Sequence, residues 1–238
     1  MTRDTGDIQE LLDAWFSGWA AIRSYRTSFD TGHPAALRLD RSGDWEYFMW
    51  DPEPAEFAAL AAVVAESPKR ALTVLGPDLH RYVHQAHLAG LGMISASEQM
   101  MIVPMETQDH QDAYLGDPDL VLKTTRLDGR RSASACTAKF SVAIHAGDTV
   151  VASGKVGVYG EYAVFDQIET HPEHRRKGYG RMIMQTLAAR ALDYPVRTGL
   201  LLASTDGQRL YFKMGWRSLC QVTVLAPMDR MHQGSPGQ

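Results

Sequence analysis

The first part of the chain shows the spacing of an amphipathic helix. Between residues 7 and 23, apolar side chains recur every three or four positions, which places them on one face of an α-helix. They are Ile8, Leu11, Leu12, Trp15, Phe16, Trp19 and Ile22. The pattern predicts a helix over residues 7–23 whose aromatic stripe packs into a core.

The rest of the first half alternates short apolar runs with longer helical patterns. A strand is favoured by four to eight apolar residues between turn formers, and a helix by a longer run after a proline. We predict strands at 36–40, 45–50 and 71–76, helices after Pro52 and after Asp78, and an extended segment at 93–105. The polar segment 107–125 is the predicted junction between the two halves.

The second half repeats this order with one additional strand. Strands are predicted near 138–145, 149–158, 162–170, 198–204 and 216–227, and helices at 178–192 and 206–214. Pro52 and Pro172 stand at matching points, as do the apolar runs ALTVLG and GLLLAS. The order predicts an α/β protein with an α+β mixed sheet, made by an internal duplication. We divide the chain of 238 residues into domains at 1–105 and 106–228 and a flexible tail at 229–238.

Composition and charge exclude several classes of protein. The formal net charge is −4, which argues against a nucleic-acid binder, and no apolar run is long enough to span a membrane. The N-terminus lacks the basic and apolar regions of a secretion signal, so we expect a cytoplasmic protein. Cys136 and Cys220 lie far apart and form no CxxC pair, which favours reduced structural thiols.

The cations cluster in one segment, HPEHRRKGYGR, between a predicted strand and a predicted helix. Unpaired N–H groups at the start of a helix favour an anion, and Gly178 and Gly180 would let the backbone approach it closely. The segment lacks the Lys-Ser or Lys-Thr of a P-loop, and Ile183 stands where the dinucleotide fingerprint needs Gly or Ala. A solvated basic turn is the alternative that these residues leave open.

The segment resembles a known family. Arg175-Arg-Lys-Gly178-Tyr-Gly180 is similar to the [QR]-x-x-G-x-[GA] motif of the GCN5-related N-acetyltransferases (GNAT), and LYFKMGW at 210–216 looks like the later LYxxxGF segment of that family. The resemblance implies a GNAT fold for the C-terminal half. The N-terminal half would be a degenerate GNAT-like copy, because it has neither the glycines nor the cations of this loop.

The resemblance also implies binding residues for acetyl-CoA. The strand whose last residues are Ile168, Glu169 and Thr170 would splay from the next strand and bind the pantetheine arm. Backbone amides of the loop would hold the pyrophosphate. The implied loop residues are Arg175, Arg176, Lys177, Gly178, Tyr179, Gly180 and Arg181. Many members use an Asn near the position of Ser204 for a contact with CoA. The resemblance therefore does not decide whether the Ser204 hydroxyl makes this contact here.

Three residues are candidates for catalysis. The resemblance places Tyr211 on the tyrosine that protonates the departing thiolate in many members, and a core aromatic is its structural alternative. A carboxylate on the strand before the loop would be the general base. Glu169 is our first choice and Asp166 the second. In a regular strand the two carboxylates face opposite sides, so that only one of them can be the general base. A β-bulge would reverse the choice between them.

A row of histidines lies in the first half. His80, His84 and His87 share one face of the predicted helix, but no fourth ligand stands out, so we expect a polar helix face and no metal site. The first half would line the acceptor side or mediate assembly, for instance as a homodimer.

The resemblance, together with these residues, implies an N-acetyltransferase. It would move an acetyl group from acetyl-CoA to a primary amine of a small molecule or a protein, by direct transfer in a ternary complex and without a metal. The alternatives are a non-catalytic CoA-binding or interaction module, a binder of another nucleotide phosphate, and a transferase of longer acyl groups.

Overall fold

The computed structural model describes residues 5–127 and 136–229, and the chain divides into two compact units. Unit 1 comprises Met1–Ser24, Met101–Leu202 and Asp206–Arg217, and unit 2 comprises Tyr25–Met100, Ala203–Thr205 and Ser218–Gln238. The change at Met101 lies close to the predicted domain boundary at 105. The units nevertheless do not follow the two halves of the sequence at the chain ends. The first helix belongs to unit 1 and most of the last strand belongs to unit 2.

Unit 1 is a mixed sheet with helices on both faces. Its strands follow the order β5-β10-β9-β8-β7-β6, antiparallel from β6 to β9 and parallel between β9 and β10. The elements are α1 (Thr5–Arg23), the end of β5 (Leu91–Pro104), β6 (Leu120–Arg126), β7 (Ala138–Ala146), β8 (Thr149–Tyr159), β9 (Tyr162–Thr170), α4 (Tyr179–Leu192), β10 (Thr198–Ala203) and α5 (Thr205–Lys213).

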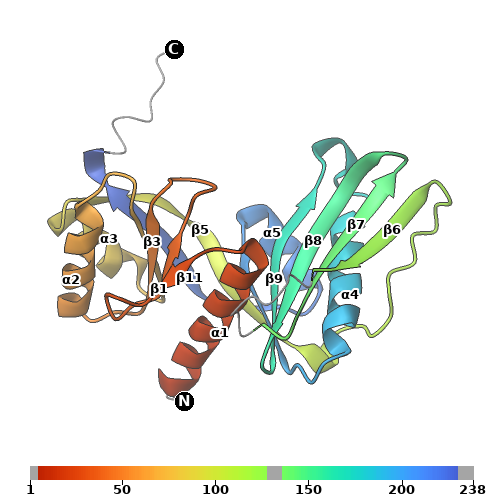
Figure 1. The fold of residues 1–238 in the computed structure, drawn as a ribbon, viewed down its shortest axis with the longest axis horizontal. Coiled ribbons are helices and arrows are strands. Elements are labelled where there is room, and N and C mark those ends of the chain that lie inside the picture. The colour runs from red at the N-terminus through yellow and green to blue at the C-terminus, as the bar shows by residue number, and fades with distance from the viewer. Residues whose placement is uncertain (1–4, 128–135, 230–238) are drawn as a thin grey trace, which may run out of the picture. The chain divides into compact units, whose positions relative to one another are not determined.

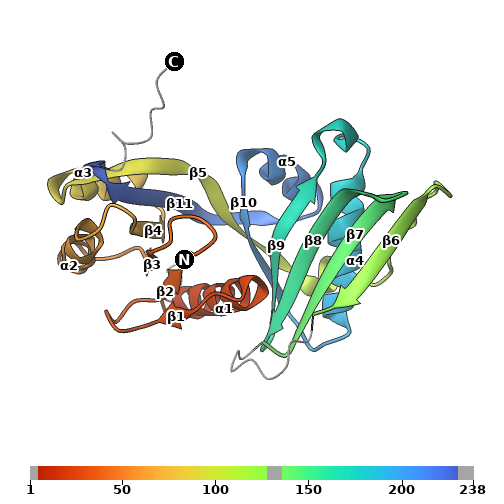
Figure 2. The same ribbon diagram turned by 45° about the horizontal axis from the view of Figure 1, so that its top comes forward.

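Glycines on β8 let the two helices approach the sheet closely. A Cβ placed on Gly154 would lie 2.7 Å from Cγ2 of Ile183 in α4, whereas one on Gly157 would lie 3.2 Å from Cγ1 of Ile22 in α1. Positions three apart in a strand face opposite sides. Helix α4 therefore covers one face of β7, β8 and β9 and α1 packs on the other face of β8 and β9 (Figures 1 and 2).

The aromatic stripe of α1 is buried, as predicted, and polar contacts fix both ends of the helix. Leu12, Trp15 and Phe16 are at most 2% exposed. Near its start, the Tyr162 hydroxyl donates to Glu10 Oε1 at 2.7 Å. Near its end, Lys139 Nζ donates to the Ala21 carbonyl at 3.0 Å, where a cation meets the negative end of the helix dipole.

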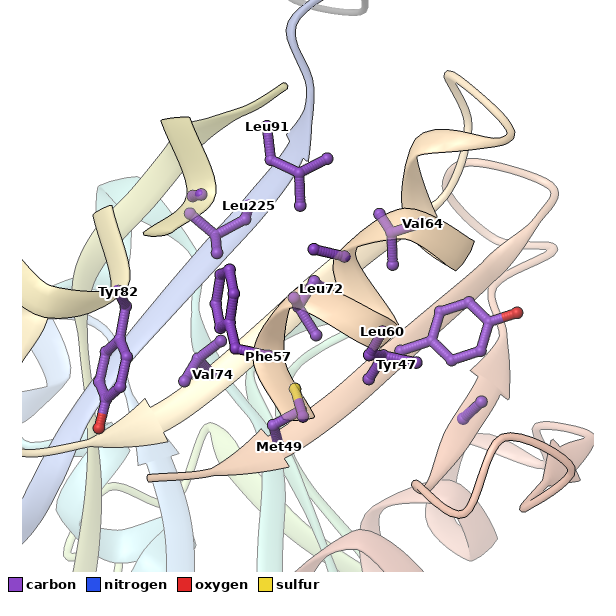
Figure 3. Close-up of a cluster of buried hydrophobic side chains, with 13 residues drawn as sticks. Tyr47, Met49, Phe57, Leu60, Val64, Leu72, Val74, Tyr82, Leu91 and Leu225 are labelled. Carbon is purple, nitrogen blue, oxygen red and sulfur yellow. The ribbon is translucent and has the colours of Figure 1, made fainter. Parts of the chain in front are cut away.

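Unit 2 has its own sheet and core. Its strand order is β1-β2-β3-β4-β11-β5. The elements are β1 (Thr27–Ser28), β2 (Ala35–Leu37), β3 (Trp45–Trp50), α2 (Pro54–Ala65), β4 (Ala71–Gly76), α3 (Leu79–Leu88), the first part of β5, and β11 (Arg217–Pro227). Figure 3 shows Phe57 and Leu60 of α2 packed with Leu72 and Val74 of β4 in the apolar cluster.

The two halves share an order of elements. The series β2-β3-α2-β4-α3 matches β8-β9-α4-β10-α5, and in each series the two strands that flank the longer helix pair in parallel. This likeness supports the proposal of an internal duplication.

The predicted mixed α/β fold is confirmed, and two strands were missed. Strand β6 lies within the segment that we assigned to a polar junction, and β1 has only two residues. Both faces of β6 are largely exposed, so its sequence LVLKTTR lacks the apolar alternation that marks a half-buried strand. Most of the predicted tail, residues 230–238, lies outside the described residues.

Substitution of Gly18 tests the packing of α1. A Cβ on Gly18 would lie 2.8 Å from the Cβ of Val164, so we expect Gly18→Ala to lower the free energy of unfolding by about 1–3 kcal/mol, although alanine favours a helix by about 1 kcal/mol. Denaturant titration measures this. Val164→Ala in the same chain should recover part of the loss, and a Gly18→Ala protein as stable as the wild type would contradict the close approach.

Candidate functional site

The loop between β9 and α4 has the backbone of an anion-binding nest. A 3-10 turn at Pro172–His174 is followed by Arg176 with φ of +62° and by Gly178 with φ of +85°, which directly precedes α4. A left-handed residue in such a loop turns successive N–H groups toward one side. For Arg176 this conformation is unfavourable.

Consecutive amides of this loop are left without acceptors. The N–H of Arg175 bonds to the Pro172 carbonyl and that of Met182 to the Gly178 carbonyl. Within the described ranges, the N–H groups of residues 176–181 have no acceptor outside the helix itself. They point from the positive end of the α4 dipole, so the loop favours an anion.

Four cations surround these amides. Arg175, Arg176, Lys177 and Arg181 are exposed, and none forms an ion pair with another described residue. Arg175 Nε lies 3.5 Å from the Thr170 carbonyl, at the end of β9. The loop thus has the positive charge and the free donors that favour an anion.

The two parallel strands beside the loop separate. Strands β9 and β10 pair at Tyr162–Thr198, Ala163–Gly199 and Val164–Leu200. Beyond Val164, β9 continues to Thr170 without a further pair to β10. Its backbone on that side is therefore open to a ligand that can take the place of a neighbouring strand.

A β-bulge in β9 changes which side chains share a face. Asp166 pairs with Lys155 and Glu169 with Ser153, so Gln167 and Ile168 face one residue of β8. Gln167 has φ of +55°. Directly opposed residues share a face, and Ser153 and Lys155 share theirs. Asp166 and Glu169 therefore lie on the same face.

This bulge corrects the prediction that Asp166 and Glu169 face opposite sides. The regular alternation of a strand fails here because of the extra residue. Ile168 Cδ1 would be 2.5 Å from a Cβ on Gly154, so Ile168 packs on the α4 face, and both carboxylates face the α1 side. The face of the strand therefore does not decide which of the two carboxylates is the candidate general base.

The two carboxylates differ in their surroundings. Asp166 accepts two hydrogen bonds from Arg23, at 2.5 Å from Nε to Oδ2 and at 2.9 Å from Nη2 to Oδ1. The side chains are 14% and 17% exposed, respectively. Glu169 is exposed and has no ion pair among the described residues. Glu169 is thus the carboxylate that is open to an incoming group.

Tyr211 lies in α5 and is 6% exposed, with its ring 6.0 Å from that of Trp216. Burial, with a smaller contribution from the negative charge of Asp166, raises the pKa of Tyr211 to about 12. The side chain therefore remains a phenol at neutral pH and can donate a hydrogen bond.

The other predicted binding residues lie at the edges of this site. A Cβ on Gly180 would be 3.6 Å from Thr170 Oγ1, which brings the first turn of α4 to the end of β9. Tyr179 is half-buried beside the ring of His174. Ser204 is exposed and lies between β10 and α5.

Neither cysteine has the surroundings of a nucleophile. Neither forms a disulfide, and burial raises the pKa of Cys136 and raises that of Cys220 to about 12. A nucleophilic cysteine needs a lowered pKa. In the part of the chain that the structure describes, no group of three or more His, Cys, Asp or Glu residues could hold a metal ion, and the histidines of α3 are no exception.

In unit 2, the end of β3 and the start of α2 correspond to the end of β9 and the start of α4. There the polar groups of the backbone and of the tyrosine have partners within the chain. Strands β3 and β4 pair at five positions, and the N–H of Asp51 extends the pairing to the Leu75 carbonyl at 2.8 Å. At the start of α2, the Glu53 N–H donates to the Glu56 carboxylate. Tyr82 donates to Asp51 Oδ1 at 2.5 Å, and Arg81 also pairs with Asp51.

Sequence reasoning missed Arg23 and Gln167. An arginine in the last turn of a helix is common, because it complements the dipole, and its partner lies 143 positions later. A glutamine in the left-handed region has no sequence signal either. Only the fold brings these residues to the site.

Comparison with known families identifies the C-terminal part. Residues 137–218 match the model of the acetyltransferase (GNAT) domain. This range contains the loop, the bulge and Tyr211. A search of curated protein sequences gives no match. No helix among residues 5–127 and 136–229 has the length and apolar character needed to cross a membrane.

Solved structures share the fold at low sequence identity. A GCN5-related N-acetyltransferase from Kribbella flavida has a TM-score of 0.62 and 13% identity, over 95% of this chain and 96% of that one. A tandem GNAT protein from the clavulanic acid biosynthesis pathway has a TM-score of 0.58 and 12% identity, over 87% and 79%. A conserved protein of unknown function from Staphylococcus epidermidis has a TM-score of 0.58 and 10% identity, over 91% and 97%.

The influence of Asp166 on Tyr211 can be measured by titration. Asp166→Asn removes a negative charge that disfavours the tyrosinate, so we expect the pKa of Tyr211 to fall from about 12 and to stay above its ordinary value because burial persists. The phenolate absorbance of each protein, minus that of its Tyr211→Phe counterpart, gives this pKa. An unchanged value would show that Asp166 does not act on Tyr211.

Proposed function

Because residues 137–218 form a domain of the GNAT superfamily, we propose that this protein is an N-acetyltransferase that moves an acetyl group from acetyl-CoA to a primary amine, by direct transfer in a ternary complex. The observation that carries the proposal is the loop at 176–181, where free amides and unpaired cations lie beside the end of β9. In that segment β9 no longer pairs with β10.

The residues at this loop fit acetyl-CoA. The amides of residues 176–181 and the side chains of Arg175, Arg176, Lys177 and Arg181 would hold the pyrophosphate. The open backbone of β9, from Ile168 to Thr170, would bind the amides of the pantetheine arm. When bound, acetyl-CoA supplies an activated acetyl thioester whose leaving group is a thiol.

The remaining chemistry needs a proton acceptor and a hydrogen-bond donor. We assign the first to Glu169, which is exposed and shares a face with Asp166, and which would take a proton from the ammonium of the acceptor. Tyr211 Oη would donate a hydrogen bond to the leaving sulfur. At neutral pH the phenol keeps its proton, as this role requires.

Unit 2 would not bind a second acetyl-CoA. Its parallel strands remain paired to their ends, and its helix start is met by the Glu56 carboxylate, which would repel a phosphate. We therefore propose one acetyl-CoA for each chain. For the aromatic-rich unit 2 we propose a role in assembly, for instance as a homodimer.

The loop can be tested with a matched pair of glycines. Gly178 and Gly147 both have positive φ and nothing within 4 Å of a Cβ, so Gly→Ala costs a similar ~1–2 kcal/mol of backbone strain at each. We expect Gly178→Ala to weaken CoA binding about 10-fold or more, because it displaces the loop amides. Gly147→Ala, in the turn between β7 and β8, should leave binding unchanged.

Isothermal titration calorimetry with CoA measures both variants and the number of sites. Equal affinity in the two variants would place the pyrophosphate elsewhere. Two sites for each chain would contradict the assignment of unit 2. Competition by ATP or NAD as strong as that by CoA would favour another nucleotide phosphate as the ligand.

Tyr211→Phe tests the hydrogen bond to the leaving thiolate. A hydrogen bond to a charged group contributes about 1.5–3 kcal/mol, so we expect kcat to fall about 10- to 100-fold with little change in CoA affinity. The measurement is thiol release from acetyl-CoA in the presence of a panel of primary amines. An unchanged kcat would leave Tyr211 as a core aromatic.

The same assay separates the enzyme from a non-catalytic CoA-binding module. Only an enzyme releases thiol in an amine-dependent way. CoA binding without such release across small amines, polyamines, amino sugars and lysine peptides would contradict the proposed activity.

A further inference from the structure

Arg23 connects the first helix of the chain to the strand that borders the site. It lies in the last turn of α1, and Ser24, with φ of +56°, turns the chain away directly after it. The guanidinium meets the carboxylate of Asp166 through two hydrogen bonds that join Nε to Oδ2 and Nη2 to Oδ1. This two-point geometry fixes the orientation of a carboxylate as well as its position.

The place of this ion pair in β9 is distinctive. Asp166 is the last regularly paired residue before the bulge, and the backbone of Gln167 then enters the left-handed region. Lys155, directly opposite Asp166 on β8, shares its face but forms no ion pair with it within the described ranges. Arg23 is thus the cation that holds Asp166.

The pair also separates the roles of the two carboxylates. Both oxygens of Asp166 already accept from Arg23, whereas Glu169, on the same face beyond the bulge, is exposed. Asp166 is also the charged group that acts on Tyr211. A carboxylate with this partner keeps a fixed negative charge, whereas Glu169 is open to an incoming group.

We propose that Arg23 is a positioning residue for acetyl transfer, which holds the Asp166 carboxylate in a fixed orientation on the face that it shares with Glu169 and leaves Glu169 as the proton acceptor. The inference rests on the proposed function for its catalytic meaning. Its structural part, the fixed carboxylate of Asp166, is independent of any substrate, and the titration of Tyr211 reports on it.

The first test uses the titration of Tyr211 and needs no activity. In the wild-type background, Asp166→Asn should lower the pKa of Tyr211, and in an Arg23→Gln background the same change should have a smaller effect, because an unheld carboxylate spends time in solvent. Incorporation of 3-fluorotyrosine, a more acidic phenol, keeps the titration below the pH of alkaline unfolding. Equal effects in both backgrounds would overturn the proposal.

Arg23→Lys provides a second variant that keeps the charge. Lysine is a single-point donor and cannot reproduce the two-point geometry. We expect it to restore part of the coupling between Asp166 and Tyr211. Full restoration would show that charge alone matters and would contradict a positioning role. The lysine variant also keeps the test available if Arg23→Gln does not fold.

The second test separates kcat from binding. We expect Arg23→Gln to lower amine-dependent thiol release about 10- to 100-fold, to leave the Kd for CoA within about 2-fold, and to be no worse when combined with Asp166→Asn. Arg190→Gln is the matched control, because it removes the ion pair of α4 with Asp112 in the same unit and should leave kcat unchanged.

Two outcomes of the second test would contradict the proposal. They are a loss of CoA affinity as large as the loss of kcat, and a kcat equal to that of Arg190→Gln. If the wild type releases no thiol with any amine, the proposed function fails, and the titration of Tyr211 still decides whether Arg23 positions Asp166.

Discussion

The site depends on one interruption of a sheet. In unit 1, β9 stops pairing with β10 after the Val164–Leu200 pair, while β9 itself continues to Thr170. Each unpaired backbone group of that segment needs another partner. The bulge at Gln167, the left-handed turn at Arg176 and the free amides at the start of α4 all follow by residue 181. Together they leave a continuous set of backbone donors and acceptors for one extended anionic ligand.

Unit 2 shows what the same order of elements does without this interruption. Its parallel strands pair to their ends, and the groups that a ligand would satisfy have partners within the chain. Asp51 accepts from Tyr82, and Glu56 accepts at the start of α2. A tyrosine thus occurs in the shorter helix of both halves, but Tyr82 is fixed by Asp51, whereas Tyr211 has no such bond among the described residues. If the halves arose by duplication, as we propose, they share the order of elements. They differ in whether these polar groups have hydrogen-bond partners within the chain, as in unit 2, or are left without them, as in the described part of unit 1.

The sequence predicted most elements of this fold and the loop, because both depend on local signals. Apolar periodicity marked α1 and β10, and glycines with adjacent cations marked the segment before α4. It did not predict β6, which carries no alternation because both of its faces are exposed. It placed Asp166 and Glu169 on opposite faces, because a bulge adds a residue that no local pattern announces. Contacts such as that of Arg23 with Asp166 are set by the fold and cannot be read from nearby residues.

The importance of such distant contacts follows from the chemistry that the chain can offer. Burial raises the pKa of both cysteines, so neither offers a thiolate as nucleophile. The direct transfer that we propose would then depend on how well the amine, the thioester, Glu169 and Tyr211 are aligned, because small displacements of such groups are costly. Glu169 comes from β9 and Tyr211 from α5. A two-point contact from α1 to the residue just before the bulge is therefore where the first helix of the chain can influence the reaction without contacting either substrate.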